Sequence, residues 1–314
     1  MAGVSWIHTY YQGIKNGTYT VGRWIEQVYE YIIHGLENKE FFLDLKRAND
    51  AIEYFETHCF HTEGPLAPGN ITLEVWEKAF YSAVYGLVDA NGLRQFREIV
   101  LVVGRKNGKT KIASSAAKYT FEREGGYGAR VFCIAPKLEQ ANLVYNDVWQ
   151  MVTLDPEWQA LRDEVKMTDS RGRLLNDDSM LARHRQSELS IPGTNASVKK
   201  VAFSAKKSDG FNPSLCICDE VAAWEGDKGL KQYEVMKSGM GAREEAILLS
   251  CTTSGYINDS IYDELFIRST RFLKGDSKEK KLLPFLYVID DPEKWNDINV
   301  LRKANPNLGV SVSI

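Results

Sequence analysis

The sequence predicts an α/β fold in which a mainly parallel sheet is flanked by helices. Short apolar runs alternate with helix-like segments from residue 98 onward, and strands separated by helices are typical of a parallel sheet. The central runs are apolar throughout, which is expected of strands that helices cover on both faces. Helical spacing dominates the residues before this region, so an N-terminal helical segment is expected to precede the sheet.

The N-terminal segment is expected to contain several helices. Residues 1–57 are rich in Tyr, Trp, Leu and Glu at helical spacing and predict two or three helices. The run TEGPLAPGN, residues 62–70, predicts a turn segment. Residues 72–89 predict one amphipathic helix, with Thr72 as its N-cap.

Strands and helices then alternate along the chain. The predicted strands are residues 98–104, 129–136, 198–205, 214–220 and 245–254. The helices expected between them are residues 110–124, 139–152 and 229–239. Farther on, the pattern predicts a helix over 259–273, a strand over 281–290 and a helix-like segment over 292–306.

Composition and charge are those of an ordinary globular protein. The chain has 314 residues, of which 44% are hydrophobic, and a formal net charge of −3. No apolar run approaches the roughly 18 residues of a membrane span, and no signal peptide is visible. The five cysteines include no CxxC pair, so we expect a reducing, intracellular protein without structural disulfides. The slightly acidic total does not suggest a protein that coats nucleic acid, although a local basic channel could still hold a duplex.

The run VGRKNGKT, residues 103–110, predicts a phosphate-binding loop between a strand and a helix. Such a loop needs converging backbone N–H groups at a helix N-terminus and a lysine for the outer phosphates. Gly104 and Gly108 permit the tight path, Lys109 supplies the charge, and Thr110 offers a hydroxyl to Mg²⁺. Val103 stands where the usual pattern has its first glycine. The residues predicted to bind the nucleotide here are Gly104, Arg105, Lys106, Asn107, Gly108, Lys109 and Thr110.

An acidic pair ends the predicted strand 214–220. Asp219 can hold the water shell of Mg²⁺, and Glu220 can polarise the water that attacks the γ-phosphate. Two carboxylates in sequence favour a hydrolase over a small-molecule kinase, because a kinase must exclude water from the transfer.

Two further runs have alternative interpretations. LLSCTTSG, residues 248–255, ends a strand in hydroxyl residues, which can respond to the γ-phosphate or simply form a β-turn. THCFH, residues 57–61, offers His58, Cys59 and His61 as metal ligands. Three ligands so close in sequence make poor zinc geometry, so a turn packed by Cys59 and Phe60 is favoured.

Taken together, these motifs resemble the large terminase subunit of tailed bacteriophages. The resemblance covers roughly residues 55–310 and runs in family order. It implies a RecA-like P-loop NTPase fold of the additional-strand, catalytic-glutamate class, and an ATP-driven motor that moves double-stranded DNA through a portal into a procapsid. The runs that carry it are GRKNGKT, CIAPKLEQANLVY, SAKKSDGFNPSLCICDEVAAW, SCTTSG and DDPEKWND with ANPNLG.

The resemblance also implies roles for single residues. Lys109 and Thr110 would bind ATP and Mg²⁺, with Asp219 as a metal residue and Glu220 as the catalytic base. Arg105 would contact the γ-phosphate, since a guanidinium forms a fixed fork that matches phosphate oxygens. The other residues implied are Thr252 and Thr253 in the coupling motif, and Trp76 and Glu77 on the adenine side, where the family usually has glutamine in place of Glu77.

The resemblance implies three parts: an N-terminal helical segment over 1–94 that leads into the adenine-side helix, a P-loop ATPase core over 95–256, and a small lid or linker over 257–314. The spaced carboxylates of a two-metal nuclease are not found, so we expect the motor half of a longer protein. Some branches of the family carry an Arg-Gly pair that is suited to act on the site of a neighbouring subunit. This chain has Asp209-Gly210 at that position, with Lys206 and Lys207 nearby.

The implied partners are double-stranded DNA, the portal protein, the small terminase subunit and further copies of the chain in a ring. The implied location is the host cytoplasm, transiently at the procapsid portal. Two alternatives remain at this point: a helicase-like ATPase that remodels nucleic acid, and a docking module that keeps only a relic of the loop.

Overall fold

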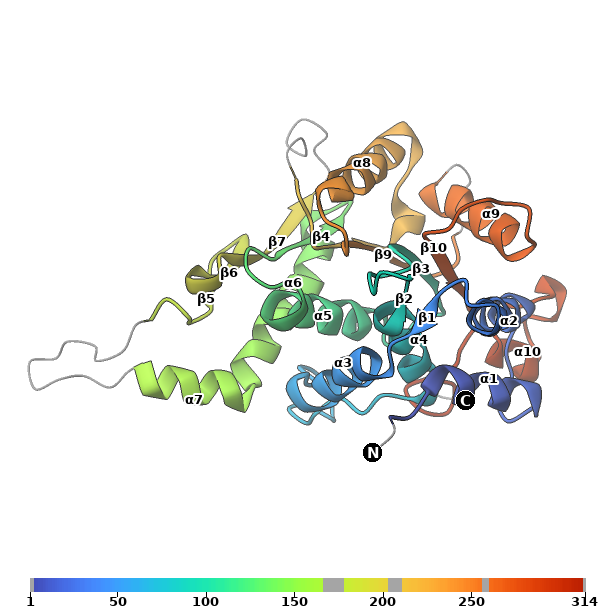
Figure 1. Ribbon diagram of the computed structural model, residues 1–314, viewed down its shortest axis with the longest axis horizontal. Coiled ribbons are helices and arrows are strands. Elements are labelled where there is room, and N and C mark those ends of the chain that lie inside the picture. Colours follow the sequence, from blue (N-terminus) through green and yellow to red (C-terminus); the bar gives the residue numbers. More distant parts are fainter. Residues whose placement is uncertain (1–2, 166–177, 203–210, 256–259, 313–314) are drawn as a thin grey trace, which may run out of the picture.

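The computed structural model describes residues 3–165, 178–202, 211–255 and 260–312. Its main sheet has eight strands in the order β10-β3-β9-β8-β4-β7-β6-β5 (Figure 1). Neighbouring strands from β10 to β7 are parallel, and β6 and β5 are added antiparallel at one edge. The predicted α/β class with a mainly parallel sheet is therefore confirmed. The strands are β3 (Glu98–Val102), β4 (Arg130–Ala135), β5 (Arg183–His184), β6 (Glu188–Ile191), β7 (Ala196–Ala202), β8 (Leu215–Asp219), β9 (Ile247–Thr252) and β10 (Leu282–Leu286).

Helices cover the sheet on both faces (Figure 1). One face packs against α8 (Gly226–Gly239) and α9 (Ile261–Leu273). The other face packs against α5 (Lys109–Tyr119) and α6 (Leu138–Leu154), and against the N-terminal helices. This arrangement explains the continuous apolar runs, because β3 and β9 are buried along their whole length. The remaining helices are α1 (Trp6–Lys15), α2 (Arg23–Glu37), α3 (Leu45–His58), α4 (Val75–Gly86), α7 (Pro156–Val165) and α10 (Ile298–Arg302), and a small second sheet pairs β1 (Phe42–Leu43) with β2 (Leu87–Val88).

The predicted helix over 72–89 is present as α4, but two details of the prediction are wrong. The N-cap is Glu74 instead of Thr72: the Glu74 side chain accepts from the backbone at Glu77, whose own side chain accepts from Glu74 N. This reciprocal capping box fixes the start of the helix. The helix is also buried on nearly all sides, since it lies between the sheet and helices α1 and α3.

The segment expected as a lid or linker, residues 257–314, contributes to the main sheet. Its strand β10 pairs in parallel with β3, from Leu282 opposite Glu98 to Leu286 opposite Val102. Phe285 of this strand packs edge-on against Phe80 of α4. The sheet and its core therefore continue past residue 256, which joins the C-terminal segment to the strand that enters the phosphate loop.

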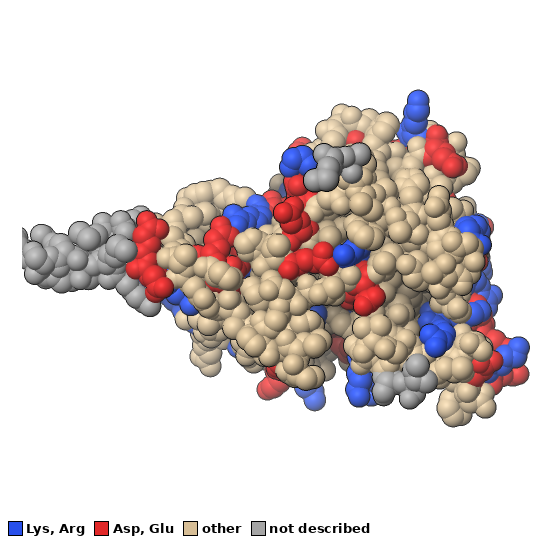
Figure 2. Space-filling view, turned by 90° about the horizontal axis from the view of Figure 1, so that it is seen from below, with Lys and Arg blue, Asp and Glu red and all other residues tan. Residues whose placement is uncertain are grey.

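Charge is mixed on the face of the molecule that Figure 2 shows, where acidic and basic side chains are interspersed. All five cysteines are free thiols and are buried. Among the residues that the structure describes, none of the helices combines the length and apolar character that crossing a membrane requires.

Candidate nucleotide site

The loop between β3 and α5 has the backbone geometry of an anion-binding nest. Lys106, with a φ of 64°, and Gly108, with a φ of 79°, are left-handed on either side of Asn107. The backbone N–H groups of Arg105, Lys106 and Gly108 make no hydrogen bond to any described residue. They precede the N-terminus of α5, where free N–H groups and the helix dipole favour negative charge. The loop is therefore shaped to receive a phosphate.

Lys109 points back onto the loop. Its Nζ donates to the carbonyl oxygens of Val103 and Gly104, both at 3.3 Å. Partial burial lowers the pKa of this ammonium, while the nearby Glu220 and Asp219 carboxylates oppose that shift. Two long bonds to neutral carbonyls satisfy a partly desolvated cation poorly, so a phosphate oxygen would be a stronger partner.

Arg105 and Thr110 are exposed at the two ends of the loop. Within the described part of the chain, the Arg105 guanidinium makes no hydrogen bond or ion pair, so it is free to reach a ligand. The Thr110 hydroxyl lies one residue beyond Lys109, at the first turn of α5. The contact of both side chains with a nucleotide stays a prediction.

The acidic pair lies at the carboxyl end of β8. Burial, together with the adjacent Glu220 carboxylate, raises the pKa of Asp219 to about 6, while the hydrogen bond from the Glu220 N–H and the Lys109 charge oppose the shift. Glu220 is left-handed, with φ 51° and ψ 51°, a conformation that a non-glycine residue adopts at a cost of about 1–2 kcal/mol. Its backbone N–H donates to Cys251 O at 2.8 Å, which ties the strained residue to β9.

The hydroxyl residues at the end of β9 connect the loop with the acidic pair. The Thr253 Oγ1 donates to Glu220 Oε1 at 2.9 Å. The Thr252 hydroxyl accepts from Ala222 N at 3.1 Å, and the Thr252 carbonyl accepts from Val103 N at 3.1 Å. Because β9 lies between β3 and β8, residues far apart in sequence meet at the carboxyl ends of these three strands. A simple β-turn does not account for these bonds.

The donor set at this edge also fits a hard divalent cation. Thr110 offers a hydroxyl oxygen, and Asp219 offers a half-buried carboxylate. Oxygen donors of this kind suit Mg²⁺, which keeps several waters and needs few protein ligands. The role of Thr110 and Asp219 as Mg²⁺ ligands stays a prediction.

Trp76 and Glu77 lie beside the loop but are both buried. Trp76 borders a cavity of about 230 Å³ that Tyr19, Glu74 and Asn305 also line. Glu77 is not among the residues that line it; its Oε1 faces Gly108, where an added Cβ would lie 3.3 Å away. Burial raises the pKa of Glu77 to about 7. The contact of Trp76 and Glu77 with adenine stays a prediction. What the structure adds is that Glu77 adjoins the phosphate loop at Gly108.

Replacing Glu77 with glutamine is expected to stabilise the protein at about pH 8 and to have little effect at about pH 5. The pKa of Glu77 is raised in the folded state from 4.5 to about 7. Folding therefore favours the protonated form, and stability is lost as the pH rises through this window. The penalty above it is roughly 3 kcal/mol, which the neutral amide avoids.

Thermal unfolding at both pH values measures the effect of Glu77→Gln. Glu264→Gln is the control, because Glu264 is an exposed glutamate in the first turn of α9. An equal gain for both variants, or a Glu77→Gln gain independent of pH, would contradict the argument. Comparing ATP with GTP affinity in the same variant tests whether this position affects base choice.

Two asparagines near the C-terminus belong to the site although no role was predicted for them. Asn305 Oδ1 accepts from Asn107 Nδ2 at 2.9 Å, and Asn307 Oδ1 accepts from Trp76 Nε1 at 2.6 Å. They lie in the ANPNLG run, which contributed only to the resemblance. The asparagines could not be assigned because polar residues after the last strand are typical of a loop.

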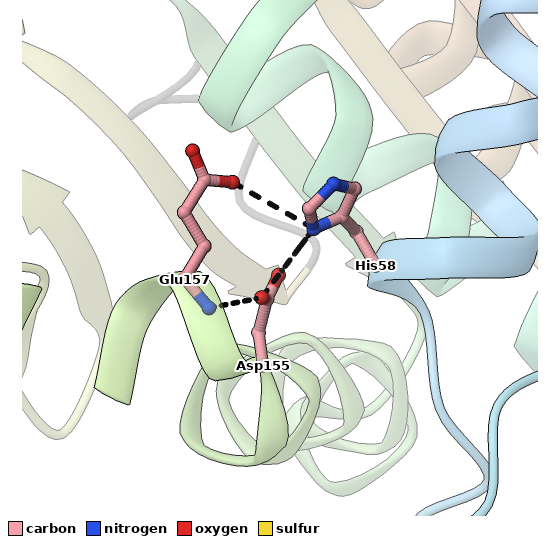
Figure 3. A group of neighbouring side chains, drawn as sticks. All are labelled: His58, Asp155 and Glu157. Carbon is pink, nitrogen blue, oxygen red and sulfur yellow. Dashed lines mark hydrogen bonds and ion pairs between the residues drawn. The ribbon is translucent and has the colours of Figure 1, made fainter. Parts of the chain in front are cut away.

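His58, Asp155 and Glu157 form a group whose possible ligand atoms lie within 4.8 Å of one another (Figure 3). Cations already pair with both carboxylates: Lys118 Nζ lies 2.7 Å from Asp155, and Arg123 binds Glu157. The group is therefore an ion-pair network between helices. Cys59 and Phe60 are buried, as predicted, but THCFH is not a turn: Thr57 and His58 end α3, and Phe60 forms a β-bridge with Asn70.

The residues considered for action on a neighbouring subunit cannot be placed. Lys206, Lys207, Asp209 and Gly210 lie outside the described residues.

Comparison with known proteins identifies the family. Residues 75–270 match the family described as "Terminase large subunit, ATPase domain". The chain is similar to the "Terminase, large subunit" of Enterobacteria phage HK97, with 26% identity over 84% of this chain and 47% of the relative. It is also similar to "Protein YmfN" of Escherichia coli strain K12, with 35% identity over 34% of this chain and 23% of the relative.

The fold agrees with a solved structure. The crystal structure of the HK97 bacteriophage large terminase superposes with a TM-score of 0.61 at 22% identity, over 85% of this chain and 49% of that one. The chain thus spans about half the length, or less, of these relatives. Because the family match covers more than half of the chain, this protein belongs to the family of terminase large subunit ATPase domains.

Proposed function

We propose that this chain hydrolyses ATP and that the hydrolysis drives double-stranded DNA into a procapsid. The observation that carries the proposal is the hydrogen-bonded connection between the phosphate loop, Thr252, Thr253 and Glu220 at one edge of the sheet. A loop that only bound phosphate would not need a carboxylate held beside it. A relic loop in a docking module would not need one either.

The residues divide the chemistry among them. The N–H groups of the loop and the Lys109 ammonium would bind the β- and γ-phosphates. Glu220 would orient the attacking water and accept its proton, with Thr253 holding the carboxylate in place. Thr110 and Asp219 would hold Mg²⁺, whose charge would offset that of the phosphates. Lys109 thus acts on binding, whereas Glu220 acts on the attacking water.

The partners follow from the family and not from the geometry. We propose double-stranded DNA as the transported polymer, the portal protein as the docking site, and the small terminase subunit as a further partner. Several copies of the chain would form a ring on the portal, in the host cytoplasm. The family resemblance further implies a metal-dependent nuclease that cuts DNA, and the chain spans 47% of the HK97 relative.

A steady-state ATPase assay with and without linear duplex DNA and portal tests the proposal. Stimulation by portal and duplex DNA together is the expected result. Stimulation by single-stranded DNA without portal would favour the helicase-like alternative. If the chain binds DNA or portal but hydrolyses no ATP under any condition, the docking module would be favoured.

Arg105→Ala is expected to reduce turnover far more than nucleotide affinity. The exposed guanidinium can reach charge that develops on the transferred phosphoryl group, and such an arginine is typically worth about 10³ to 10⁵ in turnover. The kcat of the variant and its affinity for ADP separate the two effects. Wild-type turnover in Arg105→Ala would show that Arg105 takes no part in hydrolysis.

The same assay reports whether a neighbouring subunit completes the site. If it does, specific activity of the wild type rises with protein concentration and on assembly with portal. A specific activity independent of both would remove the need for a second subunit and leave Arg105 acting within its own chain.

A further inference from the structure

The C-terminal segment 304–311 is hydrogen-bonded to the phosphate loop along its length. Gly104 N donates to Ala304 O at 3.1 Å, and Asn307 N donates to Asn107 Oδ1 at 3.0 Å. Ser311 Oγ donates to Lys106 O at 2.7 Å. These contacts join segments about 200 residues apart in sequence.

Asn107 is the centre of this arrangement, and its side chain is buried. Its Nδ2 donates to Asn305 Oδ1 at 2.9 Å and to the carbonyls of Gly104 and Arg105, both at 3.1 Å. Its Oδ1 accepts from Asn307 N, and Asn307 accepts in turn from the indole of Trp76. We call Asn107, Asn305 and Asn307 the asparagine network.

The network determines which way the loop's polar groups face. The carbonyls of Gly104, Arg105 and Lys106 all accept hydrogen bonds from side chains. These carbonyls are the acceptors with which the neighbouring N–H groups could otherwise close ordinary turns. With these carbonyls engaged, the N–H groups of Arg105, Lys106 and Gly108, which have no partner among the described residues, remain available to a ligand.

Gly104 permits this close approach. An added Cβ would lie 2.2 Å from Asn305 Oδ1 and 3.1 Å from Ala304 O. The glycine is therefore explained by contact with the C-terminal segment. Gly104 is not in the left-handed region, so a positive φ is not the reason for a glycine here.

We propose that Asn305 and Asn307 are positioning residues of the nucleotide site. Acting through Asn107, they hold the phosphate loop in its receptive conformation before the nucleotide arrives. Holding the loop in advance removes an ordering penalty from binding. The proposal rests on the proposed function for the identity of the ligand, and concerns affinity, because neither asparagine touches Glu220 or the residues that hold it.

Asn305→Ala is the variant that tests the proposal, with Mg-ADP as the probe in titration calorimetry. The expected result is about fivefold to tenfold weaker binding, equivalent to one buried hydrogen bond. The KM for ATP should rise by a similar factor while kcat stays within about twofold. Asn299→Ala is the control, because Asn299 lies exposed in α10, just before segment 304–311.

A double-mutant cycle tests whether Asn305 acts through Asn107. The Asn107→Ala/Asn305→Ala protein should bind Mg-ADP no more weakly than Asn107→Ala alone, within about twofold. Additive losses would overturn the proposed route. Wild-type affinity in Asn305→Ala, or an equal loss in Asn299→Ala, would overturn the proposal while leaving the proposed function in place. No binding of Mg-ADP by the wild-type chain would instead overturn the proposed function.

Discussion

Lys109→Ala is expected to lose ATP binding at concentrations that saturate the wild-type protein. The ammonium is the group that we propose for the outer phosphates, and without a ligand it contacts two carbonyl oxygens at 3.3 Å. A charge-assisted bond to phosphate is worth about 1.5–3 kcal/mol. Losing one such bond corresponds to about tenfold to hundredfold in affinity, and the methyl group of alanine restores none of it.

Binding of Mg-ATP by Lys109→Ala can be measured directly by calorimetry. Lys228→Ala is the matched control, because Lys228 is an exposed lysine on α8. The unfolding temperature without nucleotide should change little, since Lys109 makes only long bonds in the free loop. Equal ATP affinity in wild type and Lys109→Ala would remove the loop from the nucleotide site.

Glu220→Gln is expected to bind ATP normally and to lose about 10²–10⁴-fold in turnover. Glutamine has the same shape and can still accept the hydroxyl of Thr253, so the strained backbone and its contacts are retained. It cannot take the proton of the attacking water. The substitution therefore leaves the binding of ATP unchanged and removes stabilisation of the transition state for hydrolysis.

Single-turnover hydrolysis and ATP affinity, measured together, separate these two effects. Glu234→Gln is the control, because Glu234 is exposed on α8. Substantial hydrolysis by Glu220→Gln would transfer the general-base role to another group. Weakened ATP binding with normal kcat would show that Glu220 acts in the ground state instead.

The core of the fold could be predicted from sequence because burial leaves a strong pattern. The strands β3, β4, β8 and β9 all lie within predicted apolar runs, since strands covered on both faces tolerate few polar residues. The weak elements were not predicted. Strand β5 is two exposed residues, Arg183 and His184, and neither composition nor alternation distinguishes it from a loop.

The candidate site could be predicted only where its chemistry is compact in the sequence. The loop with Lys109 and the pair Asp219–Glu220 are each contiguous, and parallel strands bring their carboxyl ends to one edge. The left-handed backbone at Glu220 was not predictable, because local preference opposes it and the bond to Cys251 O stabilises it. The roles of Asn305 and Asn307 depend on a contact with residues about 200 positions away.

The position of β9 determines when this strand is exposed as the protein unfolds. This strand is buried along its length and is hydrogen-bonded to β3 on one side and β8 on the other. Opening its amides to solvent requires the whole centre of the sheet to separate, whereas α7 and β5 lie at the far end (Figure 1). Amide hydrogens of β9 thus belong to the slowest class to exchange with deuterium, and those of the rim to the fastest. Partial denaturation would unfold α7 and β5 first. The phosphate loop and the Asp219–Glu220 pair would stay connected through β9 until the last cooperative step.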